Sequence, residues 1–446
     1  MIISRIGQRM YSHRILIWLR SLRETTIDSF RRYTNLKTQN LFDDKPPKMT
    51  ETPAETNSEE QSAEAARQAM KSKSFHSYPF YSPRFWHGMT FSNWIRLMMK
   101  NRFHVHPTRI PMTAALCVVT PINSVLKRLQ NLCYGRAIER TEISKPPVFI
   151  IGHWRSGTTL LHELLASDHR YAYPTTFQCF CPHHFLLTEW LMTRFFGFLL
   201  PSKRPMDNMS FGWSKPQEDE FALLTLGAPS PYRRMAFPNR EWSDMEFFDM
   251  VDITPEQRQQ WRQRMEHFIR VLTYKDNKPV MLKSPPHTGR VSELANLFPG
   301  AKFIHIARDP YSLFASTRRL WYALDHAQGF QHGHHRRTDE YILVCLEKMY
   351  ASFFKGCEEL EPNQIAYTRY EDLIASPIEQ ISNIYETLEL DAFETVRPGI
   401  EKQMTQRADY RPHRHQFESG LSNEINRRWQ SYFEAFGYDQ LDGTSS

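Results

Sequence analysis

The sequence predicts an α/β protein, namely a P-loop-type three-layer fold with a central parallel sheet and an N-terminal, mostly helical extension. Short continuous apolar runs bounded by proline, glycine or charged residues are typical of strands that are buried on both faces. Such runs occupy residues 147–152, 279–283 and 302–307, and a weaker one lies at 364–368. Helical segments separate these runs, and this alternation favours a parallel sheet between layers of helices.

The first predicted strand ends in the loop Gly152-His-Trp-Arg-Ser-Gly-Thr-Thr159, and a leucine stripe at helical spacing follows. A strand, the spacing Gly152-x₄-Gly157 and a helix together form the context of a phosphate-binding loop. The glycines let backbone N–H groups turn around an anion, and the helix N-terminus adds partial positive charge. The alternative is an ordinary strand–turn–helix that contains two glycines.

Two departures from the nucleoside-triphosphate pattern identify the kind of anion. Thr158 stands where an ATP or GTP enzyme has the lysine that reaches the β- and γ-phosphates, and the loop carries Arg155 instead. The strand at 302–307 ends in Arg308, where a Mg²⁺-binding acid would stand. The sequence therefore predicts an anion bound without metal, and it counts against a P-loop kinase or NTPase.

Charge and composition divide the rest of the chain. Of the formal net charge of +7, residues 1–40 supply +6, so the remainder is close to neutral and poorly suited to nucleic acid. We expect a basic amphipathic arm (1–45) that could contact a membrane or direct the chain to an organelle. A disordered acidic linker (46–74), a helical extension (75–145) and the catalytic domain (146–440) follow.

No secretory signal is recognisable, so we expect a cytoplasmic protein, with peripheral membrane contact through the arm as a further option. Polar residues and prolines interrupt the apolar segment 110–126, which is therefore not expected to cross a membrane.

Cys179, Cys181, His183 and His184 lie close together, but their spacing matches no structural zinc pattern, and no metal is predicted. Near the C-terminus we expect one helix, capped by Ser422 and closed by Gly437, with its aromatic residues on one face.

The motifs resemble those of sulfotransferases that use 3′-phosphoadenosine 5′-phosphosulfate (PAPS). Arg155-Ser156-Gly157-Thr158-Thr159 is similar to the family's 5′-phosphosulfate loop. Arg308 and Ser316, eight residues apart, are similar to its 3′-phosphate segment. Lys283 at the end of the intervening strand and Tyr370-Glu-Asp-Leu373 also match. The resemblance implies PAPS as cofactor, PAP as product and Arg155 as the group that stabilises charge on the leaving phosphate. Singly, Arg308, Ser316 and Lys283 could each be structural.

The motifs do not show which residue acts as the general base. Arginine-loop relatives commonly carry a glutamate about twenty residues after the loop, and this chain has Gln178 at the matching place. The best substitutes are Glu218 and Glu220. Their alternative role is structural, because Ser214-Lys-Pro-Gln217 predicts a capping box and acids in a first helical turn satisfy the helix dipole. His153 and His287 are weaker candidates.

The sequence leaves the acceptor open: a small molecule, glycan, lipid or peptide would each fit, with a hydroxyl or an amine as the receiving group. A non-catalytic protein that binds PAP or another nucleotide remains the main alternative, because the expected glutamate is absent.

Overall fold

The computed structural model describes residues 81–201, 211–405 and 419–441. The predicted arm (1–45) and acidic linker (46–74) lie outside the described residues. Four strands form one sheet in the order β2-β1-β3-β4, and every pair is parallel. The strands are β1 (Val148–Ile151), β2 (Met281–Lys283), β3 (Lys302–Ala307) and β4 (Ile365–Arg369). The predicted α/β fold with a central parallel sheet is confirmed.

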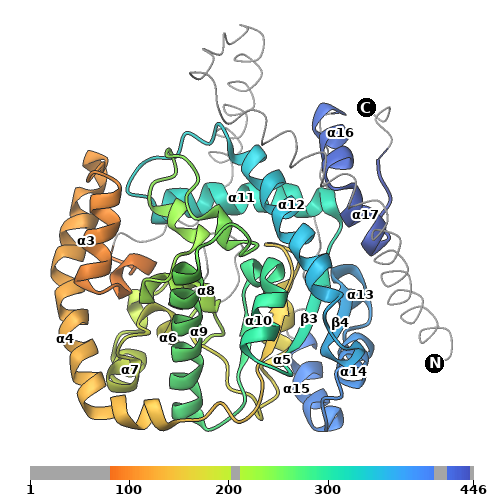
Figure 1. Cartoon of the computed structure of the whole chain (residues 1–446), viewed down its shortest axis with the longest axis horizontal. Coiled ribbons are helices and arrows are strands. Elements are labelled where there is room, and N and C mark those ends of the chain that lie inside the picture. Colours follow the sequence, from red (N-terminus) through yellow and green to blue (C-terminus); the bar gives the residue numbers. More distant parts are fainter. Residues whose placement is uncertain (1–80, 202–210, 406–418, 442–446) are drawn as a thin grey trace, which may run out of the picture.

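Helices surround this sheet (Figure 1). The α-helices of the described residues are α3 (Phe91–Lys100), α4 (Ile110–Arg140), α5 (Thr158–Leu165), α6 (Thr176–Phe180), α7 (Phe185–Phe195), α8 (Asp219–Leu226), α9 (Pro255–Asp276), α10 (Val291–Leu297), α11 (Pro310–Gln328), α12 (Thr338–Cys357), α13 (Tyr370–Ala375), α14 (Pro377–Thr387), α15 (Phe393–Thr405), α16 (Ser419–Arg428) and α17 (Gln430–Phe436). The short 3₁₀ turns are η1 (Phe85–Gly88), η2 (Pro107–Arg109), η3 (Gly197–Leu199), η4 (Pro231–Ala236), η5 (Met245–Phe247), η6 (Pro285–Arg290) and η7 (Pro362–Gln364).

Alternate residues of the strands face opposite layers. Phe149 and Phe303 belong to the larger core, together with side chains of α8 to α12. Ile150 and Ile304 belong to the smaller core, which α5, α13, α14 and α15 complete. A strand with helices on both faces needs apolar residues at every position, which explains the unbroken apolar runs.

The helical extension packs onto the larger core. The Phe85 ring stacks on Phe221 of α8 with 3.7 Å between the ring centroids, and Nε1 of Trp86 donates to the carbonyl of Gln328 at 2.7 Å. Trp94 of α3 is also buried in this core. One hydrophobic core therefore joins the described part of the extension to the sheet domain.

Helix α4 shows that the prolines and polar residues in the segment 110–126 do not break its helical structure. The chain passes Pro121 without a break and forms a single helix of 31 residues. By length and composition alone, the segment Pro107–Arg140 is the one helix of the described ranges that could cross a membrane, and only 17% of its apolar window is buried. The interruptions that we took as evidence against a span do not interrupt the helix.

The C-terminal aromatic residues lie on two helices where one was predicted. Helix α16 already begins at Ser419, so Ser422 lies inside it and is no cap, and the chain bends at Trp429 before α17. The predicted helix end at Gly437 is confirmed, because Gly437 takes the left-handed conformation (φ 65°) after α17. Trp429, Tyr432 and Phe436 are all buried.

Candidate active site

The carboxyl ends of the parallel strands bring the predicted site residues to one edge of the sheet. Ile150 of β1 pairs with Lys283 of β2, and Ile151 pairs with His305 of β3. The loop after β1, the residues after β2 and Arg308 after β3 therefore leave the sheet side by side. Ligands of open α/β sheets bind at this edge.

The loop from Gly152 to Gly157 folds tightly against its neighbours. Gly157 has φ 108°, and a Cβ atom there would lie 2.5 Å from Cδ2 of Tyr370. Arg155 also takes a positive φ of 69°. Thr158 and Thr159 form the first turn of α5, whose N-terminal N–H groups have no partner inside the helix. The loop thus has the backbone turn and the helix start that anion binding requires.

Three predicted residues meet beside this loop. Nε of Arg155 donates to Oγ of Ser316 on α11 at 2.9 Å, and Nη1 of Arg308 donates to the carbonyl of Arg155 at 2.8 Å. The Arg308 guanidinium lies over the ring of Tyr370, 4.4 Å from its centroid. Two guanidinium groups and a hydroxyl from three segments thereby face one small region, a donor set that suits phosphate oxygens.

Helix α11 is held in place by the residues before it. Asp309 is the N-cap of α11: its Oδ2 accepts from the backbone N–H of Ser312 at 2.8 Å. Glu371, in the segment Tyr370-Glu-Asp-Leu373, accepts from the backbone N–H of Asp309 at 3.1 Å. These bonds fix where α11 starts and so where Ser316 lies.

Lys283 lies on the other side of β1, where it pairs with Glu218. Nζ of Lys283 donates to Oε1 of Glu218 at 2.8 Å, and the hydroxyl of Tyr232 lies 2.7 Å from Oε2. The indole N–H of Trp154, inside the loop, donates to that same hydroxyl at 2.7 Å. Since an indole can only donate, the Tyr232 hydrogen is free to go to Glu218. Burial raises the pKa of Tyr232 well above its usual value and keeps it a donor.

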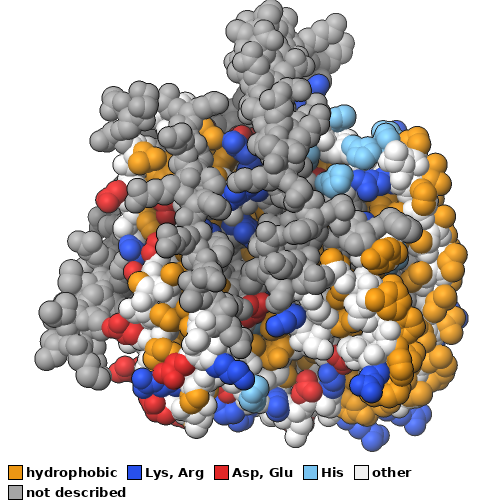
Figure 2. Space-filling model, turned by 180° about the vertical axis from the view of Figure 1, so that it is seen from behind, with side chains coloured by type: hydrophobic (Ala, Val, Ile, Leu, Met, Phe, Trp, Pro, Cys, Tyr) orange, Lys and Arg blue, Asp and Glu red, His pale blue; other side chains and the backbone are white. Residues whose placement is uncertain are grey.

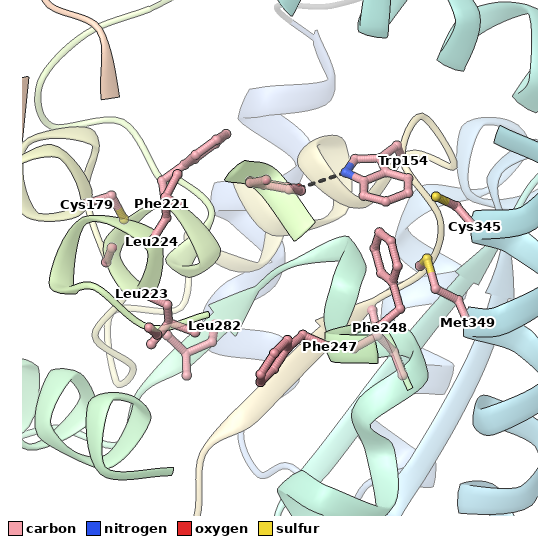
Figure 3. Close-up of a cluster of buried hydrophobic side chains, with 14 of the residues drawn as sticks. Trp154, Cys179, Phe221, Leu223, Leu224, Phe247, Phe248, Leu282, Cys345 and Met349 are labelled. Carbon is pink, nitrogen blue, oxygen red and sulfur yellow. Dashed lines mark hydrogen bonds between the residues drawn. The ribbon is translucent and has the colours of Figure 1, made fainter. Parts of the chain in front are cut away.

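Trp154 anchors this chain of bonds in the core. Figure 3 shows its indole beside Phe248, with Cys345 and Met349 of α12 nearby, and a dashed line marks the hydrogen bond that the indole nitrogen makes. The rings of Trp154 and Phe248 meet edge to face, with centroids 5.5 Å apart. Trp154 thereby links the phosphate-type loop to Glu218. Sequence reasoning missed Tyr232, because no motif marks it.

Glu220 lies in a different environment from Glu218. It is fully buried, and it accepts from Nη1 of Arg290 at 2.6 Å and from Oγ of Ser230 at 2.6 Å. Because its oxygens are occupied and have no access to solvent, this environment favours the structural alternative. Glu218 retains 14% side-chain exposure, so the structure brings only this glutamate to the edge of the sheet in a reachable position.

The predicted capping box at Ser214–Gln217 is wrong. Helix α8 begins at Asp219 with Glu218 as its N-cap, and Oε1 of Gln217 accepts from the backbone N–H of Glu218. The start of the helix was misplaced by a few residues, because the acids themselves form its first turn.

Gln178 also has a structural role. It completes a capping box with Thr175 at the start of α6, and its Nε2 donates to Oε1 of Glu189 at 3.0 Å. Gln178 is buried and neutral, and a glutamate there would lie beside the Glu189 carboxylate, which pairs with Lys275.

The two candidate histidines are both buried. Burial lowers the pKa of His153 to about 3, so its imidazole is a weak base. Nε2 of His287 lies 2.6 Å from Oδ2 of Asp219, and its other ring nitrogen lies 3.4 Å from Arg290. Neither residue has the exposure of Glu218. No group of three or more metal-ligating side chains occurs among the described residues, those near Cys179 included.

Comparisons with known proteins identify relatives of this chain. A family model described as "Sulfotransferase family" matches residues 146–395. The omega-hydroxy-beta-dihydromenaquinone-9 sulfotransferases Stf3 of Mycobacterium bovis and Mycobacterium tuberculosis are each 38% identical over 355 residues, which is 80% of this chain and 91% of theirs.

Two crystal structures share the fold at 15% identity. Sulfotransferase STF9 from Mycobacterium avium matches with a TM-score of 0.60, covering 89% of this chain and 99% of that one. Sulfotransferase STF1 from Mycobacterium tuberculosis matches with a TM-score of 0.53, covering 86% and 100%. The likeness extends beyond the sheet domain, because the matched portion of this chain exceeds residues 146–440.

Proposed function

This chain belongs to the sulfotransferase family, and from that premise we propose that it transfers a sulfuryl group from PAPS to the hydroxyl of an apolar, lipid-like acceptor. The observation that carries the donor assignment is the convergence of Arg155, Arg308 and Ser316 beside the loop after β1. Such a donor set suits a ligand with two separate phosphate groups.

The residues present fit that donor. Oγ of Ser156 and Oγ of Ser284 are buried, and neither has a hydrogen-bond partner among the described residues. Buried hydroxyls without partners cost free energy unless a ligand satisfies them. We propose that Ser156 and the N–H groups of 157–159 hold the 5′-phosphosulfate, and that Arg308 and Ser316 hold the 3′-phosphate.

When bound, PAPS supplies a sulfuryl group attached to a phosphate that becomes the leaving group. Arg155 is our candidate for stabilising the charge that develops on that phosphate, because its guanidinium cannot give up a proton at neutral pH. Lys283, at the end of β2, would add a second positive charge at the same edge. The protein then acts mainly by alignment and electrostatic stabilisation.

Glu218 is our candidate general base. Its carboxylate is held by Lys283 and Tyr232, it is partly exposed, and it is linked through Tyr232 to Trp154 in the loop. We propose that it takes the proton of the acceptor hydroxyl as the new O–S bond forms. Two fixed hydrogen bonds orient the carboxylate without rearrangement.

The relatives support a lipid-like acceptor, since their name specifies a hydroxylated menaquinone derivative. The test is transfer of ³⁵S from labelled PAPS to long-chain alcohols, hydroxylated quinones, sterols, glycans and peptides. Label on a hydroxylated apolar acceptor is the expected result.

Calorimetric titration with PAP and with ATP–Mg²⁺ completes the test. PAP binding with no transfer to any acceptor would indicate a non-catalytic nucleotide-binding protein. Binding of ATP–Mg²⁺ in preference to PAP would overturn the donor assignment.

A further inference from the structure

Helix α4 exposes an apolar stripe and buries polar side chains, which is the opposite of what a surface helix of a soluble protein does. Val118, Ile122, Val125, Leu129 and Leu132 form a stripe at three- and four-residue spacing, and all five side chains are exposed, Leu132 to 82%. A surface helix of a soluble protein turns such a stripe towards the core. This stripe points outward.

The buried side of α4 carries polar groups that bind the protein body. Nδ2 of Asn123 donates to the carbonyl of Met89 at 3.0 Å, and Oε1 of Gln130 accepts from the backbone N–H of Leu186 at 3.0 Å. A helix crossing a bilayer would have to break these bonds or carry their polar groups into lipid, at considerable cost. The contacts therefore fix α4 as a helix with one side on the protein and the other side open.

Neighbouring elements extend the exposed stripe into a broad surface. Helices α3 and α7 both pack against α4. Helix α7 and the following turn η3 add large exposed aromatic side chains, namely Trp190, Phe195 and Phe198. We call this surface of α3, α4, α7 and η3 the apolar face.

The apolar face is visible in the space-filling view. Figure 2 shows hydrophobic side chains along the right-hand edge, which corresponds to the left-hand edge of Figure 1, where α3 and α4 lie. Monomeric soluble proteins rarely expose such a large contiguous apolar surface without a partner.

The charge around the apolar face identifies the partner. Residues 91–140 contain eight cations and one acid (Glu139), and six of the cations are exposed (Arg96, Lys100, Arg102, Arg128, Arg136 and Arg140), whereas Arg109 and Lys127 are partly buried. Helix α7 adds one charge of each sign, Glu189 and Arg194. Exposed cations beside exposed apolar and aromatic side chains, with Trp190 among them, are the pattern of a surface that enters an anionic lipid interface. A second copy of this chain would bring two positive fronts together, which electrostatic repulsion opposes.

We infer that the apolar face docks the enzyme on an anionic membrane, with α4 lying in the plane of the interface and not crossing the bilayer. This contact is separate from any made by the N-terminal arm. Membrane docking as such does not depend on the proposed function, but the purpose that we give it does. The face is connected to the start of α8, where Glu218 lies, through α6, because α7 packs on α6 and α6 packs on α8. A docked enzyme would meet a lipid-borne hydroxyl without extracting the lipid through water.

Vesicle binding by the full chain tests the inference without any acceptor. We would sediment the protein with vesicles of phosphatidylcholine and phosphatidylglycerol (3:1) and with vesicles of phosphatidylcholine alone. We expect binding to the anionic vesicles, weakened but not abolished by salt, because apolar burial is insensitive to screening. No binding to either vesicle would overturn the inference.

Variants assign the contact to the apolar face. Val125→Gln/Leu129→Gln/Leu132→Gln should lower the partition coefficient at least tenfold, whereas Val251→Gln should bind as the wild type. Val251 is the matched control, because it is 64% exposed but lies in the loop before α9. Quenching by brominated lipid should reach Trp190, and the difference from Trp190→Phe isolates that indole. Equal binding of the triple variant and the wild type would overturn the inference.

Two further outcomes would show that the apolar face is not the membrane contact. If Arg14→Gln/Arg20→Gln/Arg23→Gln abolished binding while the triple apolar variant bound normally, the arm would be the membrane contact. If the wild type had the mass of a dimer by light scattering and the triple variant that of a monomer, a second copy would cover the face. PAP affinity of the triple variant should equal that of the wild type, so failure of docking is distinguishable from failure of the proposed function.

Discussion

Arg155 and Ser316 are 161 positions apart in the sequence, yet Nε of Arg155 donates to Oγ of Ser316 at 2.9 Å. Arg155 comes from the loop after β1, and Ser316 lies on the helix that follows β3. Because β1 and β3 are adjacent and parallel, both segments leave the sheet at the same edge. Ser316 thereby positions the guanidinium that we assign to the leaving phosphate.

Replacing Arg155 should separate turnover from binding. Loss of a donor to developing charge costs about 2.7–4 kcal/mol, so Arg155→Ala should lower kcat roughly 10²- to 10³-fold. PAP affinity should fall much less, because the loop amides, Arg308 and Ser316 remain. Arg155→Lys should recover part of the rate, since it keeps the charge but loses the planar fork. Measuring kcat and PAP affinity on the same preparations checks this, and lost PAP binding with normal turnover per bound cofactor would contradict it.

Arg308→Ala should discriminate between ligands. Its affinity for PAP should fall about tenfold to a hundredfold, which corresponds to one charge-assisted contact of about 1.5–3 kcal/mol. Affinity for an analogue without the 3′-phosphate should change much less. Arg318→Ala is the control, because Arg318 lies on α11, the helix that follows Arg308, and pairs with the partly exposed Asp339. Equal losses for both ligands would mean that Arg308 serves the loop through its bond to the Arg155 carbonyl.

Glu218 and Glu220 form a matched pair with opposite expectations. Glu218→Gln should lower kcat at least 10²-fold, as for a lost general base. It should cost less stability than Glu220→Gln, because Glu218 is partly exposed to solvent although its partner Lys283 is buried. Glu220→Gln should destabilise the fold by about 3–5 kcal/mol, because it leaves Arg290 charged and uncompensated in the core. Kinetics and thermal unfolding of both variants check this. Normal turnover by Glu218→Gln would remove it as the base.

Gly157→Ala should disable the loop. Alanine in this left-handed conformation costs about 1–2 kcal/mol, and its Cβ atom would meet Tyr370. We expect PAP affinity to fall more than tenfold. The control is Gly135→Ala on α4, where a Cβ atom finds only ordinary contact and should stabilise the helix by about 0.5–1 kcal/mol. Unchanged PAP affinity in Gly157→Ala would show that the loop tolerates the side chain.

His305 should make the free energy of unfolding fall as the pH is lowered. It is buried between the rings of Phe353 and Phe436, and burial lowers its pKa from 6.5 to about 3. Because the unfolded chain binds the proton first, this stabilisation is complete above pH 6.5 and is lost as the pH falls towards 3.

His305→Phe tests that dependence. At pH 5 one such histidine costs about 2 kcal/mol, so the variant should lose about that much less stability than the wild type between pH 7 and pH 5. At pH 7 it should be slightly less stable, because the Tyr350 hydroxyl loses its hydrogen bond to His305. Denaturant unfolding at both pH values measures the difference, and an equal drop in both proteins would contradict the pKa shift.

The sequence by itself determined the strands and the loop after the first of them, and its motifs indicated the family. The apolar runs at 147–152 and 302–307 are continuous because both strand faces are buried, a requirement that is visible locally. Gly152, Gly157 and Arg155 follow the first run directly, and Arg308 follows another. Once the strands are parallel and adjacent, their ends must meet.

Only the tertiary structure distinguishes the environments of Glu218 and Glu220. The two residues are neighbours in one acidic segment with the same local pattern, yet one lies against Lys283 and Tyr232 and the other against Arg290. Which carboxylate meets solvent depends on side chains more than ten positions away, from η4, β2 and η6. Local sequence carries no record of such partners.

The direction of α4 was decided in the same way. Its composition predicts an apolar segment but cannot tell which side the protein covers, because that depends on where Met89 and Leu186 offer partners to Asn123 and Gln130. Short-range periodicity therefore determined which elements form and which chemistry follows each strand. Long-range packing determined which polar groups are buried, paired or left at the surface, because burial is a property of the assembled fold.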